Sequence, residues 1–354
     1  MGVKCSCMHE MSRDEGSLRF EGHKDLLDPH LVTIDIGDLI RLQGVFRGYI
    51  DRRRTKSLYN NNKNSKSKAL RKGENPDLGH PINLEPSDKV PDYSSKEVQN
   101  TSRKLGNYIY HLQLDNIKRS SHGPILLSNR AVYIGEWNDS NQRDGFGMQI
   151  WPDSSIYEGY WKADFPIKGR LIFSDGDAYD GDWVNNKASG HGIFYSKEGT
   201  IYSGEWHNDK RQGQGNETTA EGSVYIGEYH QDRKHGKGIM TFIDKSEYNG
   251  EFWEDQIHGK GEYRWIDGRE YVGDWVRGKM HGQGIFIWQD GRRYDGEYQN
   301  DQKHGFGKFI STNGASYEGY WVHGKKHGLG VQYFDNGIAR KGEWEDGKRI
   351  RWVD

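Results

Sequence analysis

The stretch that decides the fold is YVGDWVRGKMHGQGIFIWQDGRR, residues 271–293. It opens with Tyr-x-Gly-acid-aromatic, a pattern that returns along the chain at intervals of 24, 22 and then seven times 23 residues. Tyrosine opens nine copies, which begin at residues 133, 157, 179, 202, 225, 248, 271, 294 and 317, and Arg340 opens a tenth. Chance does not hold a spacing so constant, so residues 133–354 are an array of repeats.

Side-chain alternation within one copy predicts two strands. Counting the opening tyrosine as position 0, positions 0, 2 and 4 share one face of the first strand, and positions 11, 13, 15 and 17 share one face of the second. A six-residue loop between them places Tyr271 opposite Phe286. It also places Trp275 over Gly282, where a ring covers bare glycine backbone. An Asp-Gly pair at positions 19 and 20 then turns the chain toward the next hairpin.

This unit resembles the MORN repeat, with nine full units and a partial tenth over 133–354. The resemblance implies an all-β fold, an elongated twisted single-sheet solenoid of β-hairpins. The array departs from the pattern at residues 168–171, which are KGRL, and at Ser189 and Gln212, which replace the histidine of His-Gly-x-Gly. Residues 105–132 are interpreted as a degenerate capping repeat, because Tyr110 lies 23 residues before Tyr133.

Composition agrees with thin, repetitive β structure. Hydrophobic residues make up 33%, mean hydropathy is −1.01, and there are 47 glycines, yet 13% of residues are aromatic. This apolar fraction is too low for the core of a compact enzyme of this length, and the aromatic content is too high for a disordered chain. The sequence contains no run of about 18 apolar residues, so no membrane-spanning helix is predicted. No signal peptide is expected either.

Charge divides the chain into unlike parts. Residues 1–130 carry 22 basic and 16 acidic residues, a balance of +6, whereas residues 131–354 carry 28 and 36, a balance of −8. Before the capping repeat we expect three segments: an N-terminal tail over 1–30, a basic amphipathic α-helix over 31–54, and a flexible, then proline-containing linker over 55–104. The acidic array argues against nucleic acid as a partner.

The chain begins MGVKCSC, which matches the N-myristoylation pattern M-G-x-x-x-[ST] with Gly2 as the acylated residue. One myristoyl chain binds membranes only marginally, so stable anchoring needs a second element. Cys5 and Cys7, the only cysteines, are placed to carry palmitate, and a balance of +10 over 41–72 favours anionic lipid. The alternative is an accidental Gly2 beside two incidental thiols.

A second motif, LQGVFRGYIDR at 42–52, resembles the IQ motif [IL]-Q-x-x-x-R-G-x-x-x-R, whose family binds calmodulin or a related EF-hand protein. Independently, its apolar residues follow the spacing of one helix face. These are Leu42, Val45, Phe46, Tyr49 and Ile50. A basic amphipathic helix fits an acidic, Met-rich groove. The alternative is a helix that packs on the ribbon or lies on lipid.

The resemblance also implies roles within the IQ-type motif. Leu42 and Phe46 would anchor in one lobe of the partner, and Gln43 would bond backbone between the lobes. Gly48 would allow close approach of the partner. The two basic residues of the motif, Arg47 and Arg52, would pair with acidic residues of the partner. Because the same basic face cannot hold membrane and calmodulin together, the segment would act as an electrostatic switch.

Recurring polar residues do not form a predicted catalytic, cofactor or metal site. The histidines of successive units would lie roughly 9–10 Å apart, too far to share one zinc ion, and are interpreted as structural. The acids at position 3 face away from the rings, and no nucleophile–base–orienter set is present. The sequence therefore predicts a non-enzymatic protein without a cofactor.

An uncovered face of rings is the predicted recognition surface, a groove for a protein segment or anionic phospholipid. Its predicted residues are Tyr202, Trp206, Tyr225, Tyr248, Trp265, Tyr271, Trp275, Phe286, Trp288 and Tyr294. With the resemblance, this predicts a lipid-anchored, calmodulin-responsive scaffold on the cytoplasmic face of a membrane. The alternatives are a strut in a ciliary, axonemal or cortical cytoskeletal assembly and an accessory subunit of a phosphoinositide kinase.

Overall fold

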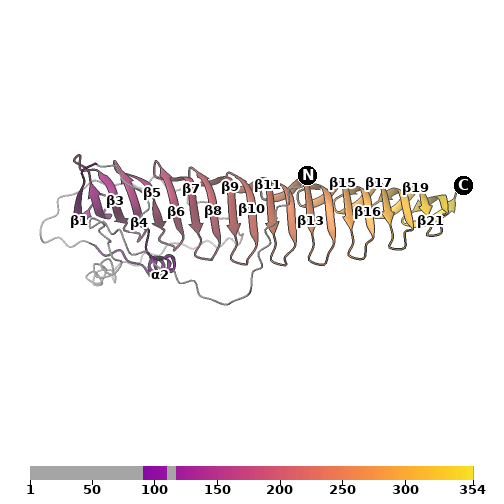
Figure 1. Cartoon of the computed structure of the whole chain (residues 1–354), viewed down its shortest axis with the longest axis horizontal. Coiled ribbons are helices and arrows are strands. Elements are labelled where there is room, and N and C mark those ends of the chain that lie inside the picture. The colour runs from indigo at the N-terminus through magenta and orange to yellow at the C-terminus, as the bar shows by residue number, and fades with distance from the viewer. Residues whose placement is uncertain (1–90, 110–116, 354) are drawn as a thin grey trace, which may run out of the picture.

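The computed structural model describes residues 91–109 and 117–353. In these residues every strand pairs antiparallel with its sequence neighbours, giving one sheet that meanders from β1 to β21 (Figure 1). The all-β repeat predicted from the sequence is confirmed. The elements are α2 (Lys96–Leu105), β1 (Ser120–Leu126), β2 (Val132–Trp137), β3 (Arg143–Ile150), β4 (Ile156–Lys162), β5 (Phe165–Ile172), β6 (Ala178–Val184), β7 (Lys187–Tyr195), β8 (Ile201–His207), β9 (Lys210–Thr218), β10 (Val224–His230), β11 (Arg233–Thr241), β12 (Glu247–Trp253), β13 (Gln256–Arg264), β14 (Glu270–Val276), β15 (Lys279–Ile287), β16 (Arg293–Gln299), β17 (Gln302–Ile310), β18 (Ser316–Val322), β19 (Lys325–Tyr333), β20 (Ala339–Glu345) and β21 (Lys348–Trp352).

Each repeat is one hairpin, and its turn is tighter than predicted. β14 and β15 are joined by only two residues, Arg277 and Gly278, with φ of 51° and 76°. Two successive positive φ values are the signature of a type I′ turn, which matches the twist of the flanking strands. The predicted six-residue loop is therefore wrong, because both strands continue almost to the tip of the hairpin.

The extra residues are absorbed in a bulge. Tyr271 pairs with Phe286 as predicted, but the register then shifts, and Trp275 pairs with Met280. The predicted placement of Trp275 over Gly282 is therefore wrong. Gly282 itself has φ of 51°, the left-handed conformation that a glycine provides in a G1-type bulge.

The acid at position 3 holds this bulge. Asp274 Oδ2 accepts a hydrogen bond of 2.9 Å from the N–H of Gln283, the residue after the bulge glycine. Glu228 and Glu297 accept the equivalent bond at 3.0 Å, from Lys237 and Phe306. The row of acids is thus part of the hairpin's backbone hydrogen bonding.

Rings at positions 0 and 4 form the core, which is one continuous ladder. Tyr271 is fully buried and meets Trp275 and the next hairpin's Tyr298 edge to face, at centroid distances of 5.0 and 5.2 Å. Its hydroxyl donates to the carbonyl of Asp274 at 3.0 Å. The ring lies over Gly284, where an added Cβ would come within 2.3 Å of Tyr271 Oη. A ring therefore covers glycine backbone as predicted, but it is the ring of the position-0 tyrosine.

Two polar links join the hairpin β14–β15 to the hairpins on either side of it. At position 4, Trp275 Nε1 donates to the carbonyl of Gly261 in the preceding hairpin at 3.2 Å. At the turn, Asp301 Oδ1 accepts from the N–H of Met280 at 2.8 Å, while the Asp301 N–H donates to the Met280 carbonyl at 3.0 Å. The hairpin β14–β15 is thereby linked to the preceding hairpin at the ladder and to the following one at the turn.

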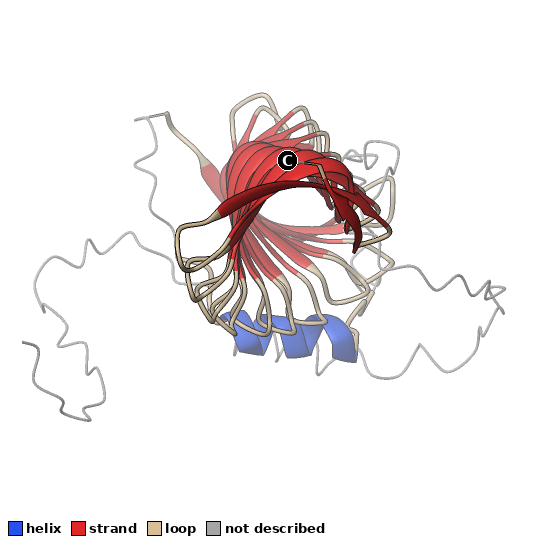
Figure 2. Ribbon diagram, turned by 90° about the vertical axis from the view of Figure 1, so that its right-hand side faces the viewer, coloured by secondary structure: helices blue, strands red, loops and turns tan. Residues whose placement is uncertain are grey.

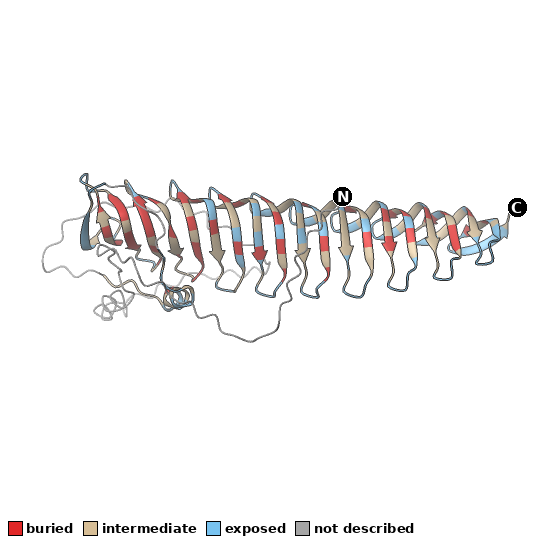
Figure 3. Cartoon of the chain, viewed as in Figure 1, coloured by how far each residue is buried: buried red, intermediate tan, exposed pale blue. Residues whose placement is uncertain are grey.

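The sheet curls about its long axis (Figure 2). A single sheet can bury one of its faces only by curling toward it, so the face that carries the ladder is the inner one, here called the ring face. Burial along the strands alternates accordingly (Figure 3), and the outer face exposes side chains such as Ile226 and Val272. No second layer covers the sheet along most of its described length.

α2 packs on the outer face near β5. Ser95 caps it, and its side chain accepts from the N–H of Val98, which is buried against Ile172 and Ala178. The flexible linker expected over 55–104 is therefore wrong at its end, where residues from Lys96 onward form a capped amphipathic helix. β1, which lies within the expected capping repeat 105–132, pairs with β2 at the edge of the sheet. In the described residues, no helix has the length and apolar character needed to cross a membrane.

Candidate partner-binding face

The ten ring residues predicted to form a groove all lie on the ring face, but they differ in exposure. Eight are buried by the ladder, with at most 7% of each residue exposed: Tyr202, Trp206, Tyr225, Tyr248, Tyr271, Trp275, Phe286 and Tyr294. Trp265 and Trp288 are half-buried and pack against the ladder. Because the curl makes neighbouring hairpins cover each other's rings, the accessible part of the face is narrower than the sequence suggested.

A second file of rings lies beside the ladder, at positions 15 and 17 of successive hairpins. We call it the rim row: Phe242, Tyr263, Trp265, Phe286, Trp288 and Phe309. Successive centroids lie 4.4 to 5.7 Å apart, so the row is continuous from β11 to β17. Phe242, Tyr263 and Phe309 were missed from the sequence, although they stand at the same positions as the predicted Trp265 and Phe286.

Cations at position 9 also point onto the ring face, and sequence reasoning missed them. They are Arg211, Lys234, Lys303 and Lys326, together with Arg143, which stands at position 10 of the longer first unit. Each lies over rings of the ladder, as when the Arg211 guanidinium carbon stands 4.8 Å from the Tyr229 centroid. Counting basic residues at one position of the repeat would have found them, because the period is fixed.

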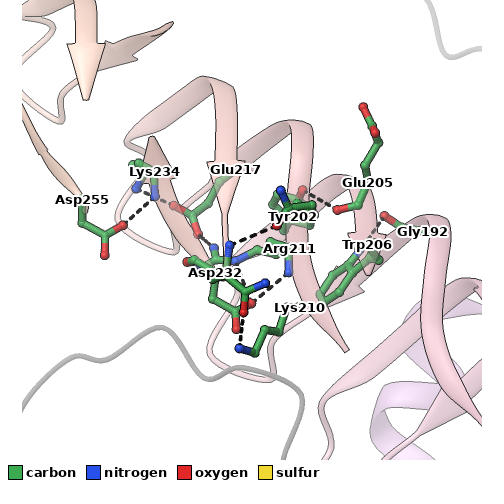
Figure 4. Close-up of polar contacts among 12 residues, drawn as sticks. Gly192, Tyr202, Glu205, Trp206, Lys210, Arg211, Glu217, Asp232, Lys234 and Asp255 are labelled. Carbon is green, nitrogen blue, oxygen red and sulfur yellow. Dashed lines mark hydrogen bonds and ion pairs between the residues drawn. The ribbon is translucent and has the colours of Figure 1, made fainter. Parts of the chain in front are cut away.

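In the first part of the ribbon these cations are neutralised within the chain. Arg143 pairs with Asp164 at 2.9 Å. Glu217 lies between Arg211 and Lys234, bonded to both, with Lys234 Nζ at 2.7 Å (Figure 4). Burial alone would raise the pKa of the Glu217 carboxyl, but Lys234 and Arg211 outweigh it and hold this pKa below its usual value. This network is closed and leaves no charge for a partner.

Lys303 stands in a different environment. Its Nζ lies 4.7 Å from the centroids of Trp288 and Phe309 and 5.0 Å from that of Trp321. Among the described residues, no carboxylate or other acceptor bonds it. Burial, with Arg292 and Lys326 nearby, lowers the pKa of the Lys303 ammonium to about 8.

Residues at position 10 act on the neighbouring turn. Ser189 Oγ accepts from the N–H of Asn208 at 3.0 Å, and His258 Nδ1 accepts from Arg277 at 3.5 Å. Ser189 and His258 therefore do the same work at this position, whereas the Nδ1 atoms of His281 and His304 are buried without a hydrogen-bond partner among the described residues. In the described residues, no His, Cys, Asp or Glu side chains gather as metal ligands would.

Comparison with known families agrees with this geometry. The model of the MORN repeat matches eight segments: 133–156, 179–201, 202–224, 225–247, 248–268, 271–292, 294–316 and 317–338. Together these segments make up more than half of the chain. The chain belongs to the MORN-repeat family. The unmatched unit at 157–178, with its KGRL departure, still forms the hairpin β4–β5 of the MORN array.

Solved structures show only a distant likeness to the MORN array. The TCP domain of Drosophila melanogaster SAS-4, solved with a proline-rich motif of Ana2, is 14% identical, with a TM-score of 0.28 over 53% of this chain and 96% of that one. The E1021V mutant of the TCP10 domain of Danio rerio CPAP is 11% identical, with a TM-score of 0.24 over 66% and 99%. Likeness at this level carries no functional argument.

The MORN repeat is a structural and binding repeat, so the array is a repeat-based binding scaffold. The other predicted sites lie outside the described residues. These are the lipidation residues Gly2, Cys5 and Cys7 and the IQ-type motif at 42–52.

Proposed function

We propose that this MORN-repeat protein is a non-enzymatic, membrane-anchored adaptor whose ribbon holds a segment of a protein partner on the ring face. The continuous rim row carries this proposal. Half-buried Trp, Tyr and Phe side chains on a rigid support are the residues that dominate protein recognition, because they bury much apolar area at little entropic cost. Anionic phospholipid is the alternative ligand of this face.

The rim row offers a matched pair of tests. Peptides are selected from a random phage library on the full chain, and their affinities are then measured for Trp265→Ala/Trp288→Ala. We expect the double variant to lose about tenfold or more in affinity, the usual scale for a central aromatic contact. Trp253→Ala is the control, because Trp253 is 56% exposed but sits at a hairpin end, where its ring centroid lies 4.5 Å from that of His235. Equal losses in both variants would refute the proposal.

Anchoring is proposed from the sequence around Gly2. A myristoyl chain with palmitate on Cys5 or Cys7 supplies the two signals that stable membrane attachment needs. Gly2→Ala should move the full chain from the membrane pellet to the supernatant of fractionated cells, whereas Gly16→Ala should not. A Gly2→Ala protein that stays in the pellet would contradict the anchor.

Regulation is proposed at the IQ-type motif. Phe46, an expected anchor residue, is replaced by aspartate, and capture of the full chain on calmodulin resin is measured with and without calcium. We expect Phe46→Asp to abolish capture and Phe20→Asp, outside the motif, to leave it unchanged. Unchanged capture by Phe46→Asp would remove calmodulin from the proposal.

One observation favours a second function, a strut in a cytoskeletal assembly. The ladder of edge-to-face rings is unbroken from Tyr133 to Trp344, which makes the ribbon one continuous body. Extraction of cells with non-ionic detergent separates the two functions. A strut stays in the detergent-insoluble residue even as Gly2→Ala, whereas a lipid-anchored adaptor is released.

A further inference from the structure

The cations of the ring face are unequally satisfied along the ribbon. Arg211 and Lys234 share Glu217, which occupies position 15 of its hairpin. In the hairpin of Lys303 the same position holds Phe309, so the cation meets a ring where Arg211 meets a carboxylate. The hairpin of Arg211 therefore shows how a carboxylate at position 15 satisfies a cation at position 9. The hairpin of Lys303 has no such carboxylate.

Lys326, the next cation along the ribbon, is also without an acid. Its Nζ stands 4.3 Å from the Tyr317 centroid and bonds the Gln332 side-chain oxygen at 3.2 Å, a neutral partner. Burial lowers the pKa of Lys326, as it does that of Lys303. The ammonium groups of Lys303 on β17 and Lys326 on β19 thus lie half-buried over aromatic rings. Neither has a counter-charge among the described residues. Desolvating charge without a partner is unfavourable, and an incoming anion would relieve it.

From this arrangement we propose that Lys303 and Lys326 form a carboxylate-binding subsite, which takes an extended, acidic, proline-containing segment of a partner protein. The subsite deepens the adaptor function proposed above and rests on it. The rim row ends at Phe309, directly beside Lys303, so rings and charges are adjacent. Proline-rich segments in the polyproline II conformation dock on grooves lined with aromatic rings, and carboxylates satisfy desolvated lysines.

Spacing decides which acidic segment fits. Lys303 and Lys326 lie on strands two apart, and strands are about 4.7–4.9 Å apart, so their backbones are separated by about 9.5 Å. A polyproline II helix rises about 3.1 Å per residue with three residues per turn, so side chains three residues apart share one side at about 9.3 Å. The segment is therefore expected to carry Glu-x-x-Glu, running along the ribbon.

The test uses the full chain and three labelled twelve-residue peptides in fluorescence anisotropy. The first repeats Glu-Pro-Pro, the second repeats Gln-Pro-Pro, and the third has the composition of the first with its glutamates adjacent. We expect the first peptide to bind about tenfold or more tighter than the second, the scale of a charge-assisted contact, and also tighter than the third. Equal affinities of the first two would overturn the proposal.

Variants locate the subsite. Lys303→Met/Lys326→Met keeps the aliphatic stems and should reduce the affinity for the Glu-Pro-Pro peptide to that for the Gln-Pro-Pro peptide. Lys308→Met is the control: it lies on the same strand as Lys303 but faces outward, where it pairs with Glu318 at 3.2 Å, and it should bind like the wild type. Equal losses in both would overturn the subsite. The double variant should melt no lower than the wild type, since it removes desolvated charge.

Two further outcomes are informative. Vesicles of phosphatidylcholine with phosphatidylinositol phosphate are the probe for lipid: if they bind through Lys303 and Lys326 while the peptides do not, the partner is not an acidic segment and the proposal falls. If peptides selected on the full chain lose affinity in Trp265→Ala/Trp288→Ala, while the Glu-Pro-Pro peptide binds Lys303→Met/Lys326→Met as tightly as the wild type, the adaptor function stands and the subsite alone is refuted.

Discussion

The ring-over-glycine contact makes a prediction that can be worked through from the structure. Gly284→Ala places a methyl group where Tyr271 lies, 2.3 Å from its Oη and 2.5 Å from its Cζ. The backbone of Gly284 is not in the left-handed region, so the cost comes from the ring alone. To relieve this clash, the fully buried ring of Tyr271 must move away from the paired glycines Gly273 and Gly284.

The magnitude has two parts. Overpacking of a well-packed site costs about 1–3 kcal/mol. Displacing the ring also loses the 3.0 Å hydrogen bond from the Tyr271 hydroxyl to the Asp274 carbonyl, worth about 1 kcal/mol. We therefore expect the hairpin β14–β15 to lose about 2–4 kcal/mol of local stability, a loss that a repeat protein confines largely to this hairpin and its neighbours.

Hydrogen exchange measured by mass spectrometry reads this out locally. Amides of β14 and β15 should exchange about 30- to 1,000-fold faster, since about 1.4 kcal/mol changes an opening equilibrium tenfold, while those of β2 and β3 stay unchanged. Gly123→Ala is the control, because Gly123 is a strand glycine with no atom within 4 Å of an added Cβ.

A double-mutant cycle makes the reasoning refutable. Tyr271→Ala is itself destabilising, but it empties the space that the new methyl needs. On this background Gly284→Ala should cost almost nothing, so the two changes are strongly coupled. If Gly284→Ala costs the same with and without Tyr271, the ring does not explain why glycine stands at this position.

Two further predictions concern the polar links. Glu217→Gln should cost about 1–3 kcal/mol at pH 7, because it leaves Arg211 and Lys234 without their buried acid. Because the pKa of Glu217 is lowered in the folded state, its contribution is present above the unfolded pKa of about 4.3 and is lost as the pH falls through the folded pKa. The difference in Tm between variant and wild type should accordingly shrink from pH 7 to pH 3, and a constant difference would contradict this account. Asp301→Ala should cost about 1 kcal/mol in urea unfolding through loss of the Met280 N–H bond, while Asp295→Ala, which breaks an exposed pair with Arg293, should have almost no effect.

The period and the alternation of side chains were enough to predict the sheet and most of its register. Tyr271 opposite Phe286 follows from a fixed repeat whose strands must bury one face. The tight turn was missed, although Asn-Asp at 208–209 and 300–301 is a type I′ signal between two strands. Once the turn is two residues long, the surplus must appear as a bulge, and the left-handed glycine at position 11 marks its place.

Exposure could not be predicted in the same way. Alternation shows that Tyr271 and Trp265 share a face, but not that the sheet curls until one is buried and the other half-exposed. Curl is a property of many hairpins packed together, since each ring is covered by its neighbours' rings. The helix α2 was missed for a simpler reason. Ser95, Glu97 and the basic residues of its last turn are helix-end signals. They lie in a segment that was interpreted as a linker because of its prolines.

The repeat separates two kinds of position, and this separation explains how one fold can carry a specific site. Positions 0, 2, 4, 11 and 13 are fixed by the ladder, the glycine pair and the bulge, so they vary little from hairpin to hairpin. Positions 9, 15 and 17 point onto the same face but are not needed for the ladder. They therefore differ along the ribbon: Glu217 closes a charge network in one hairpin, and Phe309 leaves Lys303 open in another. Exchanging position 15 between these two hairpins should keep the sheet intact and move the unpaired charge, because the ladder that holds the strands does not use it.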